Sequence, residues 1–182
     1  MGLLSVVLWT PIVAGCVLLA FSEQRYLRLV RWGALLAALV DFVLSLQVYM
    51  RFSNEEADMQ MVEKLTWIPS INVNYHLGID GISLWLVLLN TFITVLVVIA
   101  AWTNVKERLN QYMAAVLILS GLVIGTFTAM DALLFFVFFE ATLAPMYILI
   151  GIWGGPRKIY SAFKFFLYTF MGSLLMMVAM AH

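Results

Sequence analysis

The sequence contains few charged residues and a single cysteine. Charged residues make up only 11% of the 182 residues and apolar residues 64%, whereas soluble domains contain about 25% charged residues. This composition excludes an ordinary soluble domain and a disordered chain. Ten basic residues balance ten acidic ones, so no positive excess indicates nucleic-acid binding. One cysteine, Cys16, excludes a disulfide framework and a Cys-based metal site within the chain.

The sequence also lacks a glycine-rich nucleotide loop, a His-rich metal pattern and a Ser/His/Asp arrangement. Its apolar residues instead form six spans, each near the ~20 residues that a helix needs to cross a bilayer. We predict spans at Leu3–Phe21, Arg31–Tyr49, Ile82–Trp102, Tyr112–Met130, Ala132–Trp153 and Ile159–Ala181. No Lys or Arg precedes Arg25, so the first span is not a cleavable signal. The predicted fold is an all-α membrane protein with six transmembrane helices.

The basic residues predict the orientation of these helices. Eight of the ten follow the first, third and fifth spans: Arg25, Arg28, Arg31, Lys106, Arg108, Arg157, Lys158 and Lys164. Because cytoplasmic loops are enriched in Lys and Arg, this side is predicted to be cytoplasmic and the N-terminus to lie outside. Tryptophans 32, 102 and 153 fall at the same ends of the spans, as interfacial tryptophans do.

The segment Met50–Gly81 is the one long loop, and it is predicted to lie outside. Residues Ser53–Glu63 are polar and acidic, which indicates a solvated segment. Apolar and polar residues then alternate over 71–77, which predicts a strand and a short periplasmic β-hairpin before the third helix. His76 falls on the polar phase of this alternation without a partner histidine or carboxylate cluster, so a surface position is expected.

Two aspartates and a stripe of small residues carry structural predictions. Asp80 and Asp131 directly precede apolar spans and are expected to cap those helices, because Asp accepts hydrogen bonds from free N–H groups at a helix start. Gly121, Gly125 and Ala129 recur at four-residue spacing, which allows the backbone of a neighbouring helix to approach closely.

Glu140 is the most informative residue, because it lies deep in an apolar span. It follows Asp131 by nine residues, a rise of about 13–14 Å, which is close to the midplane of a hydrocarbon layer about 30 Å thick. A charge at this depth costs roughly 3 kcal/mol. Glu140 must therefore face the bundle interior, either as a proton-carrying group or as a neutral acid bonded to a neighbouring helix. Pro145 cannot bond the carbonyl of Ala141 and should loosen the helix there.

Two further ionisable residues lie within the spans. Lys164 is near the start of the sixth span and could extend to the membrane surface. Alternatively, it could contribute to a hydrated path, because Tyr160, Lys164 and Tyr168 share one helix face at four-residue spacing. Asp41 is central in the second span, with Ser45 one turn away. A structural or subunit-contact role for Asp41 is as compatible with the sequence as a transport role.

Three stretches resemble one known family. They are FEATLAPMYILIGIWGG at residues 139–155, AFKFFLYT at 162–169 and LGIDGISL at 77–84. They are similar to the M subunit of bacterial proton-translocating NADH:quinone oxidoreductase, respiratory complex I, the counterpart of mitochondrial NADH dehydrogenase subunit 4. The resemblance implies that Glu140 is the midplane carboxylate of a proton pathway and that Lys164 lies in the same hydrophilic region. Asp41 matches no motif of the family.

The resemblance also implies a longer protein. The family has about fourteen helices, with two inverted five-helix repeats after the first three. Residues 1–111 would then be the three N-terminal helices with the loop 50–81, and 112–182 the start of the first repeat. A fragment of a longer subunit is expected. The resemblance further implies that the FMN, iron–sulfur clusters and quinone belong to other subunits and that this chain holds no cofactor or metal. Its implied partners are other membrane subunits of complex I and the lipid bilayer, and its implied location is the bacterial cytoplasmic (inner) membrane.

Two alternative functions remain open at the level of sequence. A subunit of a multisubunit sodium/proton antiporter would share the glutamate helix and the lysines. A non-transporting membrane scaffold would tolerate leucine in place of Glu140. The subunits that co-purify with the chain would distinguish an antiporter subunit from a complex I subunit. Mutation of Glu140 would distinguish a scaffold from either.

Overall fold

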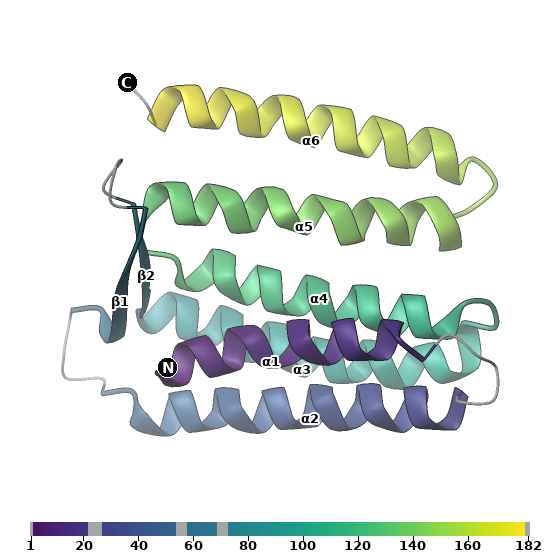
Figure 1. Ribbon diagram of the computed structural model, residues 1–182, viewed down its shortest axis with the longest axis horizontal. Coiled ribbons are helices and arrows are strands. Elements are labelled where there is room, and N and C mark those ends of the chain that lie inside the picture. Colours follow the sequence, from purple (N-terminus) through teal and green to yellow (C-terminus); the bar gives the residue numbers. More distant parts are fainter. Residues whose placement is uncertain (1, 22–26, 54–57, 69–72, 181–182) are drawn as a thin grey trace.

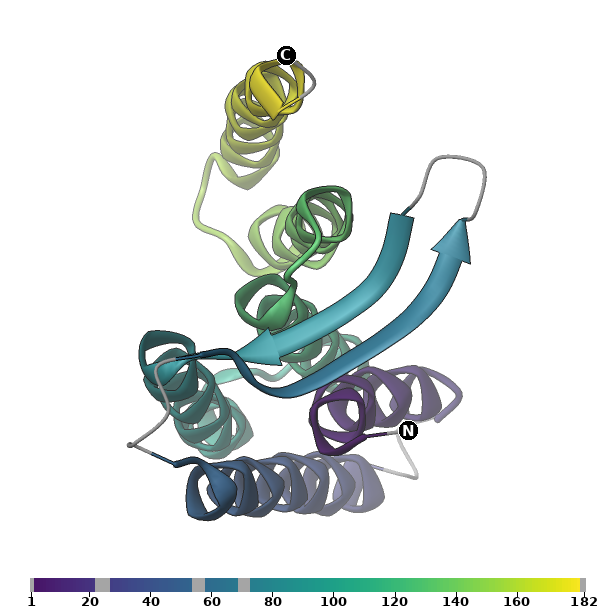
Figure 2. The same cartoon turned by 90° about the vertical axis from the view of Figure 1, so that its left-hand side faces the viewer.

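The computed structural model describes residues 2–21, 27–53, 58–68 and 73–180. Roughly parallel and antiparallel helices run side by side, and a two-stranded hairpin lies across one end of them (Figures 1 and 2). The elements are α1 (Leu3–Leu19), α2 (Leu27–Arg51), β1 (Gln60–Ile68), β2 (Val73–Ile79), α3 (Gly81–Asn104), α4 (Leu109–Thr128), α5 (Ala132–Trp153) and α6 (Lys158–Met180).

Five of these helices, α2 to α6, are long and apolar enough to cross a membrane, and the chain is a multi-pass membrane protein. The first predicted span differs, because α1 ends at Leu19 and has only 17 residues. The second helix begins at Leu27, four residues before the predicted Arg31. The predicted end of the sixth span, Ala181, lies outside the described residues, and α6 reaches Met180.

Both predicted aspartate caps are confirmed. Asp80 forms a capping box, in which its carboxylate accepts from the Ser83 N–H at 2.6 Å and the Ser83 hydroxyl accepts from the Asp80 N–H at 2.9 Å. Hydrogen bonds from the Ser83 side chain and then its backbone hold the pKa of Asp80 below its ordinary value. Asp131 accepts from the backbone N–H groups of Leu133 and Leu134 at 2.9 and 3.3 Å. These caps fix where α3 and α5 begin.

The hairpin is confirmed, but its first strand begins earlier than the sequence predicted. The predicted strand over 71–77 corresponds to β2, which runs from Val73 to Ile79, and residues 69–72 lie outside the described residues. Residues 54–57 of the predicted solvated Ser53–Glu63 segment lie outside the described residues. The last four residues of that segment belong to β1, which starts at Gln60 and pairs antiparallel with β2.

A long-range contact explains why Glu63 belongs to the hairpin. Its carboxylate accepts hydrogen bonds from the N–H groups of Gly2 and Ser5 at 3.0 and 3.1 Å, and from the Ser5 hydroxyl at 2.5 Å. The first N–H groups of a helix have no partner within the helix. Strand β1 therefore supplies the N-terminal cap of α1, a role that the acidic composition of this loop did not indicate.

Helix α4 is central in the bundle and packs against α1, α3 and α5. Gly121 confirms the predicted close approach, because a Cβ there would lie 2.8 Å from the Leu8 carbonyl oxygen of α1. A Cβ on Gly15 of α1 would likewise lie 2.9 Å from the Ala114 carbonyl oxygen of α4. The predicted stripe is shorter than expected, because Ala129 follows the end of α4 and forms a bridge with β2.

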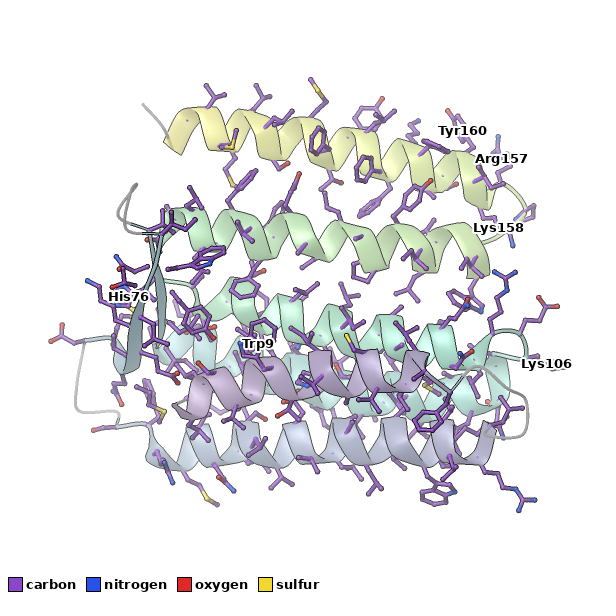
Figure 3. All side chains as sticks on the ribbon, viewed as in Figure 1. Trp9, His76, Lys106, Arg157, Lys158 and Tyr160 are labelled. Atoms are coloured by element: carbon purple, nitrogen blue, oxygen red, sulfur yellow. The ribbon has the colours of Figure 1, made fainter. Side chains whose placement is uncertain are left out.

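The charged ends of the helices are arranged as predicted. Lys106, Arg157 and Lys158 lie at the end of the bundle opposite to the hairpin, which carries His76 (Figure 3). Trp32 and Trp102 form an edge-to-face pair at 5.2 Å at the basic end. The N-terminus and the end of α6 share the hairpin end (Figure 1). The side of the membrane that each end faces stays a prediction.

Candidate functional site

Glu140 lies well inside α5. Helix α5 has 22 residues and starts at Ala132, so Glu140 lies about 12 Å from its beginning at 1.5 Å per residue. The residues before it are almost uniformly apolar, and no charged residue shares the helix. Its side chain is half-buried.

Ser173 of α6 is the polar partner of Glu140. The Ser173 hydroxyl lies 2.9 Å from the Glu140 Oε1 atom, and Ser173 is only 3% exposed. The second carboxyl oxygen, Oε2, is buried and has no hydrogen-bond partner among the described residues. Ser173 was not among the predicted site residues, although a serine in the middle of an apolar span was an available signal. The contact joins two consecutive helices through a carboxyl and a hydroxyl group.

Pro145 is buried inside α5, which continues as an α-helix to Trp153. The predicted loosening of the helix is therefore not visible as a break. Proline has no N–H to donate to the Ala141 carbonyl, so the helix is missing one hydrogen bond next to Glu140. A second proline, Pro11, lies inside α1.

Lys164 and Glu140 are not brought together. The Lys164 Nζ atom lies over the rings of Tyr160 and Tyr168, at 5.9 and 5.8 Å from their centres, which confirms the predicted shared face. These residues are exposed and line an open groove of about 420 Å³ together with Phe163, Leu167 and Met171. Ser173 is nine residues after Lys164, about two and a half turns, so the two residues project from opposite faces of α6.

Asp41 is buried in α2 at 1% exposure, and both of its carboxyl oxygens are without a hydrogen-bond partner among the described residues. Helix α2 packs against α1, α3 and α4, whereas α5 packs against α4 and α6. Asp41 and Glu140 therefore lie on helices that α4 separates (Figure 1). The structure places Asp41 in the bundle core, away from the Glu140–Ser173 contact.

A set of buried polar side chains joins α2, α3 and α4. The Ser45 hydroxyl of α2 bonds that of Thr91 of α3 at 2.9 Å. On the same helix α3, Thr94 and Asn90 donate to the Ser120 hydroxyl of α4 at 2.9 and 3.0 Å. Hydrogen bonds between membrane helices contribute to packing. Ser45 is the one member of this set that the sequence had singled out, through its position one turn from Asp41.

This arrangement can hold a proton. A carboxyl group takes up and releases a proton, and an adjacent hydroxyl can donate to or accept from it. Within the described part of the chain, no group of three or more His, Cys, Asp or Glu side chains could hold a metal ion. Glu140 and Ser173 thus form the site with the clearest chemistry.

Comparison with known proteins identifies relatives of the whole chain. Residues 129–182 match the family model described as NADH:quinone oxidoreductase/Mrp antiporter, TM. The chain is 46% identical to NADH-quinone oxidoreductase subunit M of Rhodobacter capsulatus over 98% of its own length and 35% of that protein. It is 44% identical to NADH-ubiquinone oxidoreductase chain 4 of Arabidopsis thaliana over 92% of its length and 34% of that protein.

A solved structure supports the same relationship. The chain superimposes on a chain of respiratory complex I from Thermus thermophilus with bound NADH, with a TM-score of 0.82 and 27% identity. The superposition covers 97% of this chain and 34% of the other. The chain spans about a third of the length of the relatives that it matches.

Proposed function

Since the chain belongs to the family of NADH-quinone oxidoreductase subunit M and chain 4 proteins, we propose that it is part of the proton-translocating membrane arm of respiratory complex I. Glu140 is the proton-carrying residue in this proposal. The observation that carries it is an acid about 12 Å inside an apolar helix, turned toward Ser173 of α6 and with its second oxygen buried. Intramembrane acids of this kind are expensive and are functional by default.

The proposal gives the other candidate residues subordinate roles. Lys164, with Tyr160 and Tyr168, forms a polar face of α6 that would line a hydrated part of the pathway. Pro145 would shape α5 next to Glu140. Asp41 would contribute from the core of α2, either to the pathway or to the packing of the helices around it.

The proposed topology has six transmembrane helices and places the N-terminus, the hairpin and the end of α6 outside. Its support is the gathering of Lys106, Arg157 and Lys158 at the opposite end of the bundle (Figure 3). Residues 1–111 would form the N-terminal helices and 112–182 the start of a repeat. The proposed location is the bacterial cytoplasmic membrane, with other complex I membrane subunits and lipid as neighbours. In this proposal the chain holds no cofactor, and the FMN, iron–sulfur clusters and quinone belong to other subunits.

The test is the substitution Glu140→Gln in the assembled membrane complex. The amide keeps the volume and can still bond Ser173, but it cannot release a proton at ordinary pH. Proton uptake into inverted membrane vesicles, and the NADH oxidation coupled to it, should collapse while assembly is retained. Glu140→Asp should give an intermediate rate, because the acid remains but is withdrawn by about one methylene.

A matched control is Glu107→Gln, the same chemical change at an exposed position in the loop between α3 and α4. It should leave proton uptake unchanged. Wild-type rates in an assembled Glu140→Gln complex would overturn the proton-carrier role. Tolerance of Glu140→Leu would favour the scaffold alternative.

A sodium/proton antiporter subunit is a second candidate, because the family model that matches residues 129–182 is shared with Mrp antiporters. Purification of the complex from its native membrane separates the two. Iron–sulfur and flavin subunits that co-purify with the chain would support complex I. Small antiporter subunits without redox centres would support the alternative.

A further inference from the structure

We infer that Ser173 is a positioning residue whose hydroxyl group turns between two acceptors according to whether Glu140 holds a proton. This inference rests on the proposed role of Glu140. Ser173 lies at 2.9 Å both from the Glu140 Oε1 atom and from the Phe170 carbonyl oxygen of its own helix. A serine hydroxyl has one hydrogen to donate and two lone pairs that accept. It cannot donate fully to both oxygens at once.

The two contacts therefore define two arrangements. In the first, Glu140 is neutral and donates its own O–H to the Ser173 oxygen, while the Ser173 O–H donates to the Phe170 carbonyl. In the second, Glu140 is ionised and the Ser173 O–H has turned to donate to its carboxylate. The O–H bond of Ser173 breaks in neither arrangement. The proton leaves or returns through Glu140 alone, along the pathway of the proposed function.

This rotation matters because no other partner is available in the described part of the chain. The Glu140 Oε2 atom is buried and makes no hydrogen bond to any described residue. Ser173 is itself buried at 3% exposure, so its hydroxyl is held against α5. Lys164 projects from the opposite face of α6 and lies over the Tyr160 and Tyr168 rings. A fixed donor would favour the ionised acid, and a fixed acceptor would favour the neutral acid. A rotating hydroxyl serves both forms.

The test compares Ser173→Ala with a control on the same helix. Thr169 is one turn before Ser173 and its hydroxyl donates to the Phe165 carbonyl at 2.8 Å, but no hydrogen bond joins it to Glu140 in the described structure. Thr169→Ala removes the same kind of bond to the helix backbone. We expect Ser173→Ala to lower proton uptake in vesicles about tenfold, equivalent to about 1.4 kcal/mol. Thr169→Ala should stay close to wild type, and Ser173→Thr should retain most of the rate, because the hydroxyl is kept.

Infrared difference spectroscopy supplies a readout that a purely packing role would not move. The C=O stretching band of protonated Glu140 is assigned by its loss in Glu140→Gln. This band should shift in Ser173→Ala and keep its position in Ser173→Thr and Thr169→Ala. An unchanged band and rate in Ser173→Ala, or equal losses in Ser173→Ala and Thr169→Ala, would overturn the inference.

The outcomes also separate this inference from the proposed function. If Glu140→Gln pumps normally, the proposed function fails. If Glu140→Gln abolishes pumping while Ser173→Ala changes neither band nor rate, only the role of Ser173 fails. If Ser173→Ala does not assemble, Ser173→Cys takes its place, because a thiol is a weaker donor. A band and rate equal to wild type in Ser173→Cys would then overturn the inference.

Discussion

The contact between α1 and α4 predicts that Gly121 cannot be replaced by alanine without loss of stability. A Cβ at Gly121 would lie 2.5 Å from the Ile12 Cγ1 atom and 2.8 Å from the Leu8 carbonyl oxygen. The Ile12 side chain can rotate away, but the Leu8 oxygen belongs to the backbone, so α1 itself must shift. Overpacking of this kind costs about 1–3 kcal/mol, which offsets the gain of up to about 1 kcal/mol that alanine has over glycine in a helix.

Gly33→Ala on α2 is the matched control. The nearest atom to its Cβ would be the Leu18 Cδ2 atom at 3.4 Å, the flexible end of a side chain. This variant should gain the helical preference of alanine at little cost. Gly121→Ala should therefore be less stable than Gly33→Ala by about 1–3 kcal/mol.

The assay heats the purified complex with a fluorescent tag on the chain and follows its release by native electrophoresis. A change of 1 kcal/mol shifts a melting midpoint by roughly 2–4 °C for a chain of this size. The midpoint for Gly121→Ala should therefore fall several degrees below that of Gly33→Ala. Equal midpoints for the two variants would refute the reasoning from the close approach of α1 and α4.

Three further predictions concern the hairpin and the helix caps. Glu63→Gln should weaken the docking of the hairpin on α1 by about 1–2 kcal/mol, because one acceptor oxygen of the carboxylate becomes a donor. Proteases should then cleave the hairpin faster, and an unchanged cleavage rate would count against the cap of α1 by Glu63. Asp131→Ala should cost about 1 kcal/mol by removing the α5 cap, measurable as a lower melting midpoint, whereas Asp131→Asn should recover most of it. Asp80→Ala should cost a similar amount of stability at neutral pH. Since the pKa of Asp80 is lowered in the folded protein, the wild type should lose its extra stability over Asp80→Ala as the pH falls through that pKa, below the ordinary value of 3.8. A stability difference between the two proteins that persists at the lowest pH would contradict this prediction.

Local signals in the sequence were sufficient to locate most of the helices. Runs of apolar residues gave the five long helices within a few residues, because a bilayer requires a continuous apolar stretch of about 20 residues. Asp80 and Asp131 gave two helix starts, because a cap acts on N–H groups two or three residues away. The spacing of Gly121 and Gly125 indicated a close helix contact, although not with which helix.

Contacts between residues far apart in the sequence could not be predicted from these local patterns. Glu63 lies 58 residues from Ser5, and nothing in the acidic loop indicates that one carboxylate turns toward α1. The Ser173–Glu140 contact spans 33 residues and depends on how α5 and α6 are rotated about their axes. Helix α5 is apolar on nearly all sides, so its sequence carries no periodic stripe that would fix this rotation.

The surroundings of Lys164 depend partly on the sequence of α6 and partly on the packing of the bundle. The four-residue spacing of Tyr160, Lys164 and Tyr168 determined that they share a face, because that spacing is a property of the α-helix itself. Which face meets α5 was decided by tertiary packing, which buries Ala162 and Ser173 and leaves Lys164 exposed. The sequence by itself thus determined the five long helices, the caps of α3 and α5 and the depth of Glu140 within its helix. Only the packed bundle decided which groups touch Glu140, because helix rotation is set by side-chain contacts between helices and not by the order of residues within one.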